Sequence, residues 1–110
     1  MLVVTDEPAI VGPAGLVFRA LGYEIQVARD GPHALELMAK QLPDVALCDA
    51  ELTDVSKLTR DIRAIKGGER IAMILTGYGT EPIGNAADGF LPRPFDPIKV
   101  VELIEALARR

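Results

Sequence analysis

Apolar residues recur along this chain in two alternating patterns. Short runs that are continuously apolar, or that alternate apolar with polar residues, predict β-strands, whereas apolar residues spaced three or four apart predict helices. The first pattern predicts strands at residues 2–4, 23–28, 45–48, 71–75 and 90–92. The second pattern predicts helices at residues 8–21, 33–41, 56–65 and 97–109. Strands and helices therefore alternate from one end of the chain to the other.

This alternation is typical of a parallel sheet with helices on both faces. The runs 45–48 and 71–75 are uniformly apolar, as expected of strands that are buried on both faces. The segment 23–28 alternates and the segment 90–92 is short, so both suit the edges of a sheet. We therefore predict one α/β domain over residues 1–110, with a doubly wound, flavodoxin-like sheet of five parallel strands in the order 2-1-3-4-5.

Two segments interrupt the helical pattern. Gly12-Pro13 falls inside the first predicted helix, where a proline ring clashes with the carbonyl four residues back, so a kink or a late start is expected. Between the fourth and fifth strands, Pro82, Gly84 and Asn85 oppose a helix. We predict that residues 79–88 form no regular helix longer than about one turn. The fourth helix of the fold is then reduced or missing, and a dimer through that face is absent or altered.

Composition and charge exclude several classes of function. The chain has 49% hydrophobic and 25% charged residues, ordinary values for a globular protein, and its formal net charge of −4 provides no basic surface for nucleic acid. No apolar run approaches the roughly 20 residues that cross a membrane, and no basic leader precedes the first strand, so we expect a cytoplasmic protein. The single cysteine, Cys48, excludes an internal disulfide and is interpreted as a small buried hydrophobic residue.

Polar side chains follow four of the predicted strands at the point where each strand ends. They are Thr5, Asp6 and Glu7 after the first strand, Asp49 after the third, Thr76 after the fourth and Arg93 after the fifth. In the predicted strand order these side chains open onto one edge of the sheet, at the switch point between strands one and three. Carboxylates and a backbone carbonyl suit Mg²⁺, and a hydroxyl with a cation suits phosphoryl oxygens.

Each of these residues also has a purely structural interpretation. Asp6 and Asp49 each suit a turn, Glu7 suits the first turn of a helix better than a metal site, and Thr76 is a typical strand residue. His33, the only histidine, lies at a predicted helix start and is interpreted as a solvated residue there rather than a phosphorelay histidine. The convergence of several polar groups on one edge favours a site over these separate interpretations.

Five segments in order resemble the receiver domain of two-component response regulators, and the resemblance covers the whole chain. They are "LVVTDEP" (2–8), "GYEIQVARDGPHALELM" (22–38), "LPDVALCD" (42–49), "ILTGYG" (74–79) and "GFLPRPF" (89–95). They resemble, in turn, the acidic opening, the second strand and helix, the phosphoacceptor strand, the switch hydroxyl and the Lys-Pro-Phe corner of that family. The resemblance implies a signalling module that is not a conventional enzyme.

The resemblance also implies roles for individual residues. Asp49 would be the phosphoacceptor, with Asp6 and the backbone carbonyl of Glu51 as further Mg²⁺ ligands beside it. Thr76 would bond a phosphoryl oxygen, Phe90 would be the aromatic residue whose burial reports the switch, and Arg93 stands where the family has lysine. Pro94 would follow a cis peptide bond. The phosphodonor would be a sensor histidine kinase or phosphotransfer protein, and the output an unidentified downstream protein rather than nucleic acid or a membrane.

Several departures from the family pattern leave alternatives open. Thr5 replaces the first acid of the usual pair, Arg93 replaces the lysine, and the segments after Asp49 and after Thr76 are short. A pseudo-receiver, an interaction module that works without phosphate, is therefore the alternative to a phosphorylatable receiver. A small α/β enzyme is a third hypothesis, although the chain lacks a Gly-rich phosphate loop. The sequence identifies neither the kinase nor the oligomeric state, and it does not distinguish a full protein from an excised domain.

Arg93 carries a further expectation about the resting state. Arginine is longer than lysine and has a forked guanidinium that suits carboxylates. We therefore expect Arg93 to lean on Asp49 or Asp6 and to occupy part of the space that a phosphoryl group needs.

Overall fold

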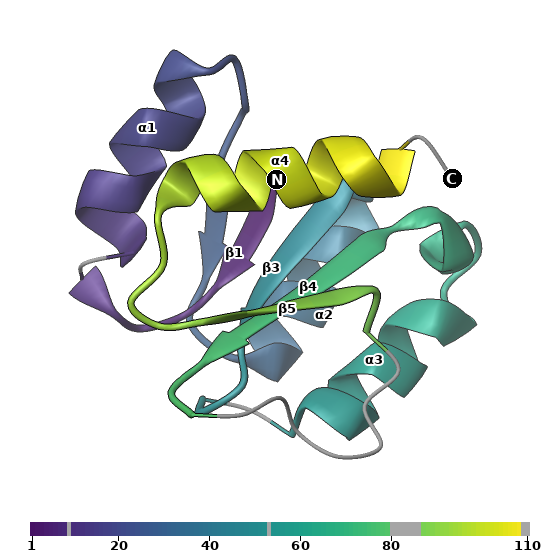
Figure 1. Cartoon of the computed structure of the whole chain (residues 1–110). Coiled ribbons are helices and arrows are strands. Elements are labelled where there is room, and N and C mark those ends of the chain that lie inside the picture. The colour runs from purple at the N-terminus through teal and green to yellow at the C-terminus, as the bar shows by residue number, and fades with distance from the viewer. Residues whose placement is uncertain (9, 53, 80–86, 109–110) are drawn as a thin grey trace.

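Five parallel strands form one sheet in the order β2-β1-β3-β4-β5 (Figure 1). The computed structural model describes residues 1–8, 10–52, 54–79 and 87–108. The strands are β1 (Leu2–Val4), β2 (Gln26–Ala28), β3 (Val45–Asp49), β4 (Ala72–Gly77) and β5 (Gly89–Pro92). The predicted fold class and strand order are confirmed. The fourth-helix prediction falls mainly on residues 80–86, which lie outside the described residues.

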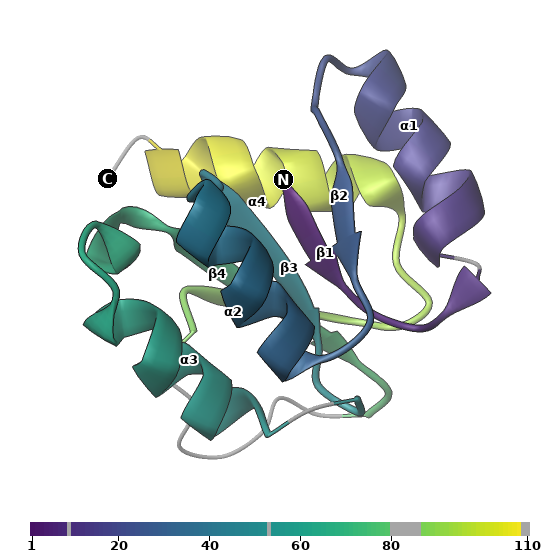
Figure 2. The same cartoon turned by 180° about the vertical axis from the view of Figure 1, so that it is seen from behind.

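Helices cover both faces of the sheet. They are α1 (Gly15–Ala20), which the π-helix η1 (Ile10–Ala14) precedes, α2 (Gly31–Lys40), α3 (Val55–Ala64), the 3₁₀ helix η2 (Gly68–Arg70) and α4 (Pro97–Ala108). Figure 1 shows α1 and α4 on one face, and Figure 2, from behind, shows α2 and α3 on the other. In the part of the chain that the structure describes, no helix is long and apolar enough to cross a membrane.

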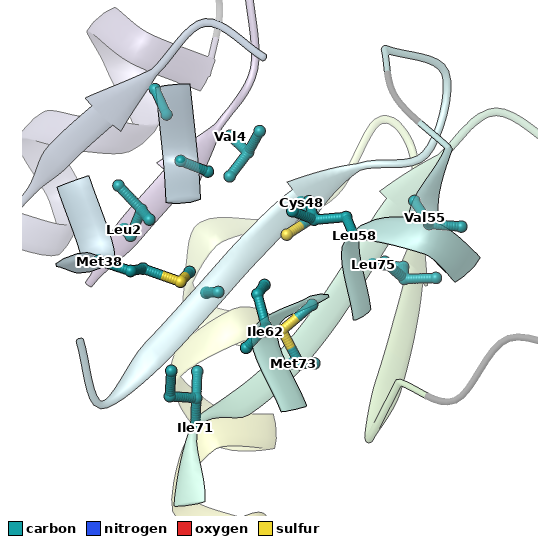
Figure 3. Close-up of a cluster of buried hydrophobic side chains, with 13 residues drawn as sticks. Leu2, Val4, Met38, Cys48, Val55, Leu58, Ile62, Ile71, Met73 and Leu75 are labelled. Carbon is teal, nitrogen blue, oxygen red and sulfur yellow. The ribbon is translucent and has the colours of Figure 1, made fainter. Parts of the chain in front are cut away.

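The alternation of side chains along each strand divides the core into two clusters. Val3, Leu47 and Ile74 face α1 and α4, where they pack with Phe18 and Val100. The intervening strand residues face α2 and α3 (Figure 3); they are Leu2, Val4, Ala46, Cys48, Met73 and Leu75. This two-sided burial explains why the central strands read as continuous apolar runs instead of alternating ones.

The first helix starts late, as the sequence predicts. The backbone N–H groups of Ile10 and Val11 both donate to the carbonyl oxygen of Glu7, at 3.1 Å each, and the π-helical segment contains Pro13. Regular α-helix begins only at Gly15. Because proline supplies no N–H, the α-helical ladder cannot run through this position. The segment after β1 is therefore irregular where it passes the carboxyl edge of the sheet.

Side-chain caps fix the starts of α2 and α3. Asp30 accepts the His33 N–H at 2.9 Å, and Asp54 accepts the Lys57 N–H at 3.1 Å. His33 also accepts the Arg29 N–H through Nδ1 at 3.2 Å, so it belongs to the start of α2. Each cap satisfies an N–H group that the first turn of a helix leaves free. The Asp54 cap also ends the β3–α3 connection, which begins directly after Asp49.

Arg63 connects the end of α3 to the start of β4. Its Nη1 donates to the carbonyl oxygens of Gly68 and Ile71, at 2.8 and 2.7 Å, and its Nη2 lies 3.0 Å from Asp88 Oδ2. Asp88 Oδ2 also accepts the N–H of Met73 at 2.8 Å. These bonds join α3, η2 and the two strands at that edge of the sheet.

Arg63→Ala is expected to lower the free energy of unfolding by about 2 kcal/mol, because two carbonyl oxygens and Asp88 lose a charged donor. Urea unfolding followed by circular dichroism measures this change. Lys57→Ala is the control, since Lys57 is 66% exposed and pairs only with Asp61 in the described chain. It should cost at most about 0.5 kcal/mol. Equal losses for the two variants would show that the Arg63 bonds add nothing beyond a surface ion pair.

Candidate functional site

Asp49 ends β3 as a buried carboxylate, with 3% of the residue exposed. Its Oδ1 accepts the N–H of Glu51 at 2.8 Å. Its Oδ2 accepts the Thr5 hydroxyl at 3.2 Å and lies 2.6 Å from Nη2 of Arg93. Both carboxylate oxygens therefore have partners supplied by this chain. A buried charge of this kind is tolerated because it is paired and hydrogen-bonded.

Arg93, directly after β5, is the cation at this carboxylate, and its side chain is 4% exposed. Its Nη1 donates to Oε2 of Glu7 at 2.8 Å, and its Cζ lies 5.4 Å from the centroid of the Tyr78 ring. Burial alone would lower the pKa of the guanidinium, but contact with Asp49 and its charge, then Tyr78 and Glu7, raise that pKa above its usual value. Arg93 is therefore a permanently charged group between two carboxylates.

Thr76 lies opposite Asp49 in the pairing of β3 with β4. Its carbonyl oxygen accepts the N–H of Ala50 at 2.8 Å, which fixes the loop after β3 against β4. Its hydroxyl is buried and has no hydrogen-bond partner among the residues that the structure describes. Buried hydroxyls are nearly always bonded, so this one identifies a place where a polar group fits.

Two aromatic residues lie near Thr76, Phe90 on the neighbouring strand β5 and Tyr78 directly after β4. Phe90 is half-buried on β5, pairs in register with Leu75 and packs against the cluster under α2 and α3. Tyr78, which follows β4, is exposed, and its N–H donates to Oε1 of Glu51 at 3.2 Å. The Glu51 side chain therefore connects the loop after β3 to the loop after β4.

Asp6 follows β1 and is exposed, without a hydrogen bond or ion pair in the described part of the chain. The same residues contain no group of three acidic, histidine or cysteine side chains placed to hold a metal ion. Two carboxylates, Asp6 and Asp49, and one carbonyl, of Glu51, nevertheless provide the oxygen ligands that Mg²⁺ prefers, and Mg²⁺ usually retains several waters. The donor types fit Mg²⁺, although Arg93 and Thr5 already contact one oxygen of Asp49.

The structure brings together Asp49, Thr76 and Arg93, as the strand-end pattern predicts. The Arg93 guanidinium contacts Asp49 rather than Asp6. The Arg93-Pro94 peptide bond is cis. Sequence reasoning missed the second partner of Arg93, because Glu7 was interpreted as an acid in the first turn of a helix. Glu7 instead lies in the irregular segment before η1, and no residue pattern indicates the direction of its side chain.

A cavity of about 330 Å³ lies beside this site, between η1 and the segment that joins β5 to α4. Its walls are mainly apolar, and Glu7, Arg93 and Tyr78 contribute the polar part of the lining. The remaining lining residues are Ile10, Pro13, Ala14, Val17, Pro94, Phe95 and Pro97. The cavity therefore adjoins the ion pair between Arg93 and Glu7.

Cys48 precedes Asp49 and is fully buried. Burial, with a smaller contribution from the Asp49 charge, raises the pKa of its thiol to about 12. We expect native protein at neutral pH to react with a thiol reagent at least about 100-fold more slowly than protein in denaturant. A thiol-exchange time course, with and without urea, measures the ratio. Equal rates would mean that the β3 end opens readily.

The sequence profile of the response regulator receiver domain matches residues 1–105. The chain belongs to this family. The receiver is 29% identical to the probable transcriptional regulatory protein TcrX of Mycobacterium tuberculosis over 116 residues, covering 100% of the chain and 50% of TcrX. It is also 29% identical to the DNA-binding dual master transcriptional regulator RpaA of Synechocystis over 119 residues, covering 100% of the chain and 49% of RpaA. The receiver thus spans about half the length of these curated relatives.

Solved receiver structures share the fold. The receiver domain of the sensor histidine kinase PA1611 from Pseudomonas aeruginosa, with a magnesium ion coordinated in its active-site cleft, superposes with a TM-score of 0.83 at 25% identity. That match covers 96% of this receiver and 93% of the other chain. The chemotaxis response regulator CheY4 of Vibrio cholerae gives a TM-score of 0.82 at 24% identity, covering 98% and 94% of the two chains.

Proposed function

We propose that this receiver accepts a phosphoryl group on Asp49, with Mg²⁺, from a sensor histidine kinase or a phosphotransfer protein. The observation that carries the proposal is the hydroxyl of Thr76, which is buried and has no hydrogen-bond partner among the described residues. Thr76 lies opposite Asp49 in the pairing of β3 with β4. A phosphoryl oxygen on Asp49 would supply the acceptor that this hydroxyl lacks. Arg93, 2.6 Å from Asp49 Oδ2, supplies a positive charge at the same place.

The transfer needs one carboxylate oxygen as nucleophile. An oxygen of Asp49 attacks the phosphorus atom as the bond from phosphorus to the donor imidazole nitrogen breaks. The imidazole keeps that electron pair and takes a proton from water, while the phosphoryl group becomes an acyl phosphate on Asp49. Catalysis of this reaction consists mainly of in-line positioning and charge neutralisation.

The metal is assigned to oxygen atoms of this chain. Asp6, Asp49 and the backbone carbonyl of Glu51 would hold Mg²⁺, whose charge offsets the repulsion between carboxylate and phosphoryl group. The PA1611 receiver, which is 25% identical, has magnesium in its active-site cleft and supports this assignment. Asp6 is exposed, so its carboxylate is free to turn toward an incoming ion.

The phosphoryl group would act on a protein-interaction surface through Thr76 and Phe90. A new bond to the Thr76 hydroxyl exists only in the phosphorylated state, and only such differential contacts shift a conformational equilibrium. Phe90 lies on the neighbouring strand and is half-buried, so its ring can respond to a movement of Thr76. The target would be a downstream protein.

Incubation with a small phosphodonor and excess Mg²⁺, followed by mass spectrometry, tests the assignment. Wild-type protein should gain the mass of one phosphoryl group, and chelation of Mg²⁺ should slow the gain strongly. Asp49→Asn should abolish the gain, and Asp6→Ala should slow it by about 100-fold, since a metal ligand is lost. Absence of any gain in the wild type contradicts the proposal.

A pseudo-receiver is the second candidate, and the saturation of Asp49 favours it. Thr5, Arg93 and Glu51 already contact both oxygens of the carboxylate. In this state both oxygens of Asp49 have partners, so neither is free to act as a nucleophile without losing a contact. Unlabelled wild-type protein that still binds its partner would establish this function.

A further inference from the structure

Four residues form a closed ring of polar contacts at the proposed phosphoacceptor. Asp49 Oδ2 accepts the Thr5 hydroxyl at 3.2 Å and faces Nη2 of Arg93 at 2.6 Å. Nη1 of Arg93 donates to Glu7 Oε2 at 2.8 Å, and the backbone N–H of Glu7 donates to Thr5 Oγ1 at 3.0 Å. Glu7 therefore reaches Asp49 by two routes, one through Arg93 and the other through Thr5.

We propose that Glu7 is a positioning residue that holds the Arg93 guanidinium on Asp49 and so opposes the entry of Mg²⁺ and of a phosphoryl group. The inference rests on the proposed function of Asp49 and adds the regulation of that site. Arg93 then has a docked state, on Asp49, and a released state. Glu7 sets the balance between these two states.

The burial of Arg93 explains why Glu7 favours the docked state. The docked side chain is 4% exposed, so its charge has lost most of its water and needs compensation by carboxylates. Asp49 supplies one carboxylate and Glu7, whose side chain is 34% exposed, supplies the other. In the released state the guanidinium is hydrated, and an ion pair in water stabilises little. Glu7 thus contributes more to the docked state than to the released one.

The cavity beside Arg93 leaves room for its side chain to move. Its volume is about 330 Å³, and Arg93, Glu7 and Tyr78 are among the residues that line it. This unfilled space beside the docked guanidinium gives the side chain room to move off Asp49 toward solvent. In the docked state Tyr78 lies over the guanidinium, with 5.4 Å between the ring centroid and Cζ. Release of Arg93 from Asp49 would change this contact.

Docked Arg93 and Mg²⁺ compete for the same carboxylate. Asp49 Oδ1 accepts the Glu51 N–H, and Oδ2 faces Arg93 and Thr5, so a metal ion must displace or share one of these partners. For an ion that binds only the released state, the apparent dissociation constant is the intrinsic one divided by the fraction of protein that is released. A change that weakens docking should therefore strengthen Mg²⁺ binding.

The test compares Glu7→Gln with Glu36→Gln. The glutamine keeps the shape of Glu7 and removes its charge, whereas Glu36 is exposed on α2 and makes no bond in the described chain. In the metal-free protein, NMR of the Arg93 Nε–H should show faster exchange with water in Glu7→Gln. Titration with Mg²⁺ alone should give a dissociation constant roughly three- to tenfold lower than in wild type. Glu36→Gln should match the wild type in both measurements.

The Arg93→Met variant separates two effects of Glu7. One is the holding of Arg93 on Asp49, called the clamp below, and the other is the general effect of the Glu7 charge on cation binding. Removal of an acidic charge near a metal site should by itself weaken cation binding. In the Arg93→Met background no clamp exists, so Glu7→Gln should leave Mg²⁺ affinity unchanged or lower it. The loss or reversal of the gain in this background is a coupling between the two residues, which the Glu7–Arg93 contact explains. Glu7→Ala should act in the same direction as Glu7→Gln and more strongly.

The inference is overturned if Glu7→Gln binds Mg²⁺ as weakly as wild type or more weakly, or if Arg93 Nε–H exchange is unchanged. It is also overturned if the variant gains the same factor with methionine at position 93. These measurements use unphosphorylated protein, so they remain decisive if Asp49 takes no phosphate. Failure of phosphoryl transfer in every variant would contradict the proposed function, whereas an unaltered Arg93 would contradict the clamp.

Discussion

Gly68→Ala is expected to lower the free energy of unfolding by about 3 kcal/mol or more. A Cβ at this position would overlap the backbone carbonyl of Ile62, and a carbonyl in α3 cannot move aside as a flexible side chain would. Gly68 also accepts the Arg63 guanidinium at 2.8 Å and donates its N–H to the carbonyl of Ile65 at 2.7 Å. A shift of this turn would break both bonds. Urea unfolding followed by circular dichroism measures the loss.

Gly12→Ala is the matched control for Gly68→Ala. Gly12 lies in η1, and a Cβ there would meet no atom within 4 Å. Alanine is favoured over glycine in helical backbone by roughly 0.5–1 kcal/mol, so this variant should be unchanged or slightly more stable. A Gly68→Ala protein with wild-type stability would show that the end of α3 adjusts easily, contrary to the tight turn in the structure.

Arg93→Lys is expected to enlarge the response of Thr76 and Phe90 to phosphorylation. Arg93 touches Asp49 before any phosphate arrives, and a contact made in both states shifts no equilibrium. A lysine has one compact charge and cannot bridge Asp49 and Glu7 as the forked guanidinium does. More of its interaction should therefore form with the phosphoryl group. We expect the coupling free energy to rise by roughly 1 kcal/mol, a population change of about fivefold.

NMR spectra of both proteins, with and without a beryllium fluoride phosphate mimic, measure that response at Thr76 and Phe90. Lys99→Arg is a suitable control, because Lys99 is 62% exposed on α4 and pairs only with Glu102 within the described residues. It should respond as wild type does. A response in Arg93→Lys that is equal to or smaller than that of wild type would mean that arginine already transmits the phosphate signal fully.

The sheet was predictable from local patterns because its central strands are buried on both faces. The runs 45–48 and 71–75 require partners on two sides, and the strand order follows from placing them at the centre. Boundaries were less predictable. The strand expected at 23–28 begins only at Gln26, since the N–H of Tyr23 bonds to the carbonyl of Phe18 at 3.0 Å and closes the end of the helix. This bond and the positive φ of Gly22 form a helix C-cap that extends to Tyr23, so the apolar alternation of residues 23–28 overestimates the length of the strand.

The site was predictable as a set of strand ends but not as a set of contacts. The strand order alone places Asp49, Thr76 and Arg93 at one edge. The bridge from Arg93 to Glu7 spans 86 residues, and it depends on the irregular path before η1 and on the length of an arginine side chain. No periodicity reports such a path. The hydrogen bond that the Tyr78 N–H donates to Glu51 could not be predicted from the sequence for the same reason, since it joins two loops.

The strand order also has a consequence for the time course of folding. β1 pairs with both β2 and β3, so it becomes an interior strand only after β3 is available. The bond between Thr5 and Asp49 closes a loop of 44 residues, and the bond between Glu7 and Arg93 closes one of 86. Contacts between residues so far apart in sequence form slowly, because chain entropy must be lost before they stabilise anything. We therefore expect the helices on either side of the sheet to be protected from hydrogen exchange earlier in refolding than the carboxyl edge of the sheet. The edge that carries Asp49, Thr76 and Arg93 would then be the last part of the domain to assemble.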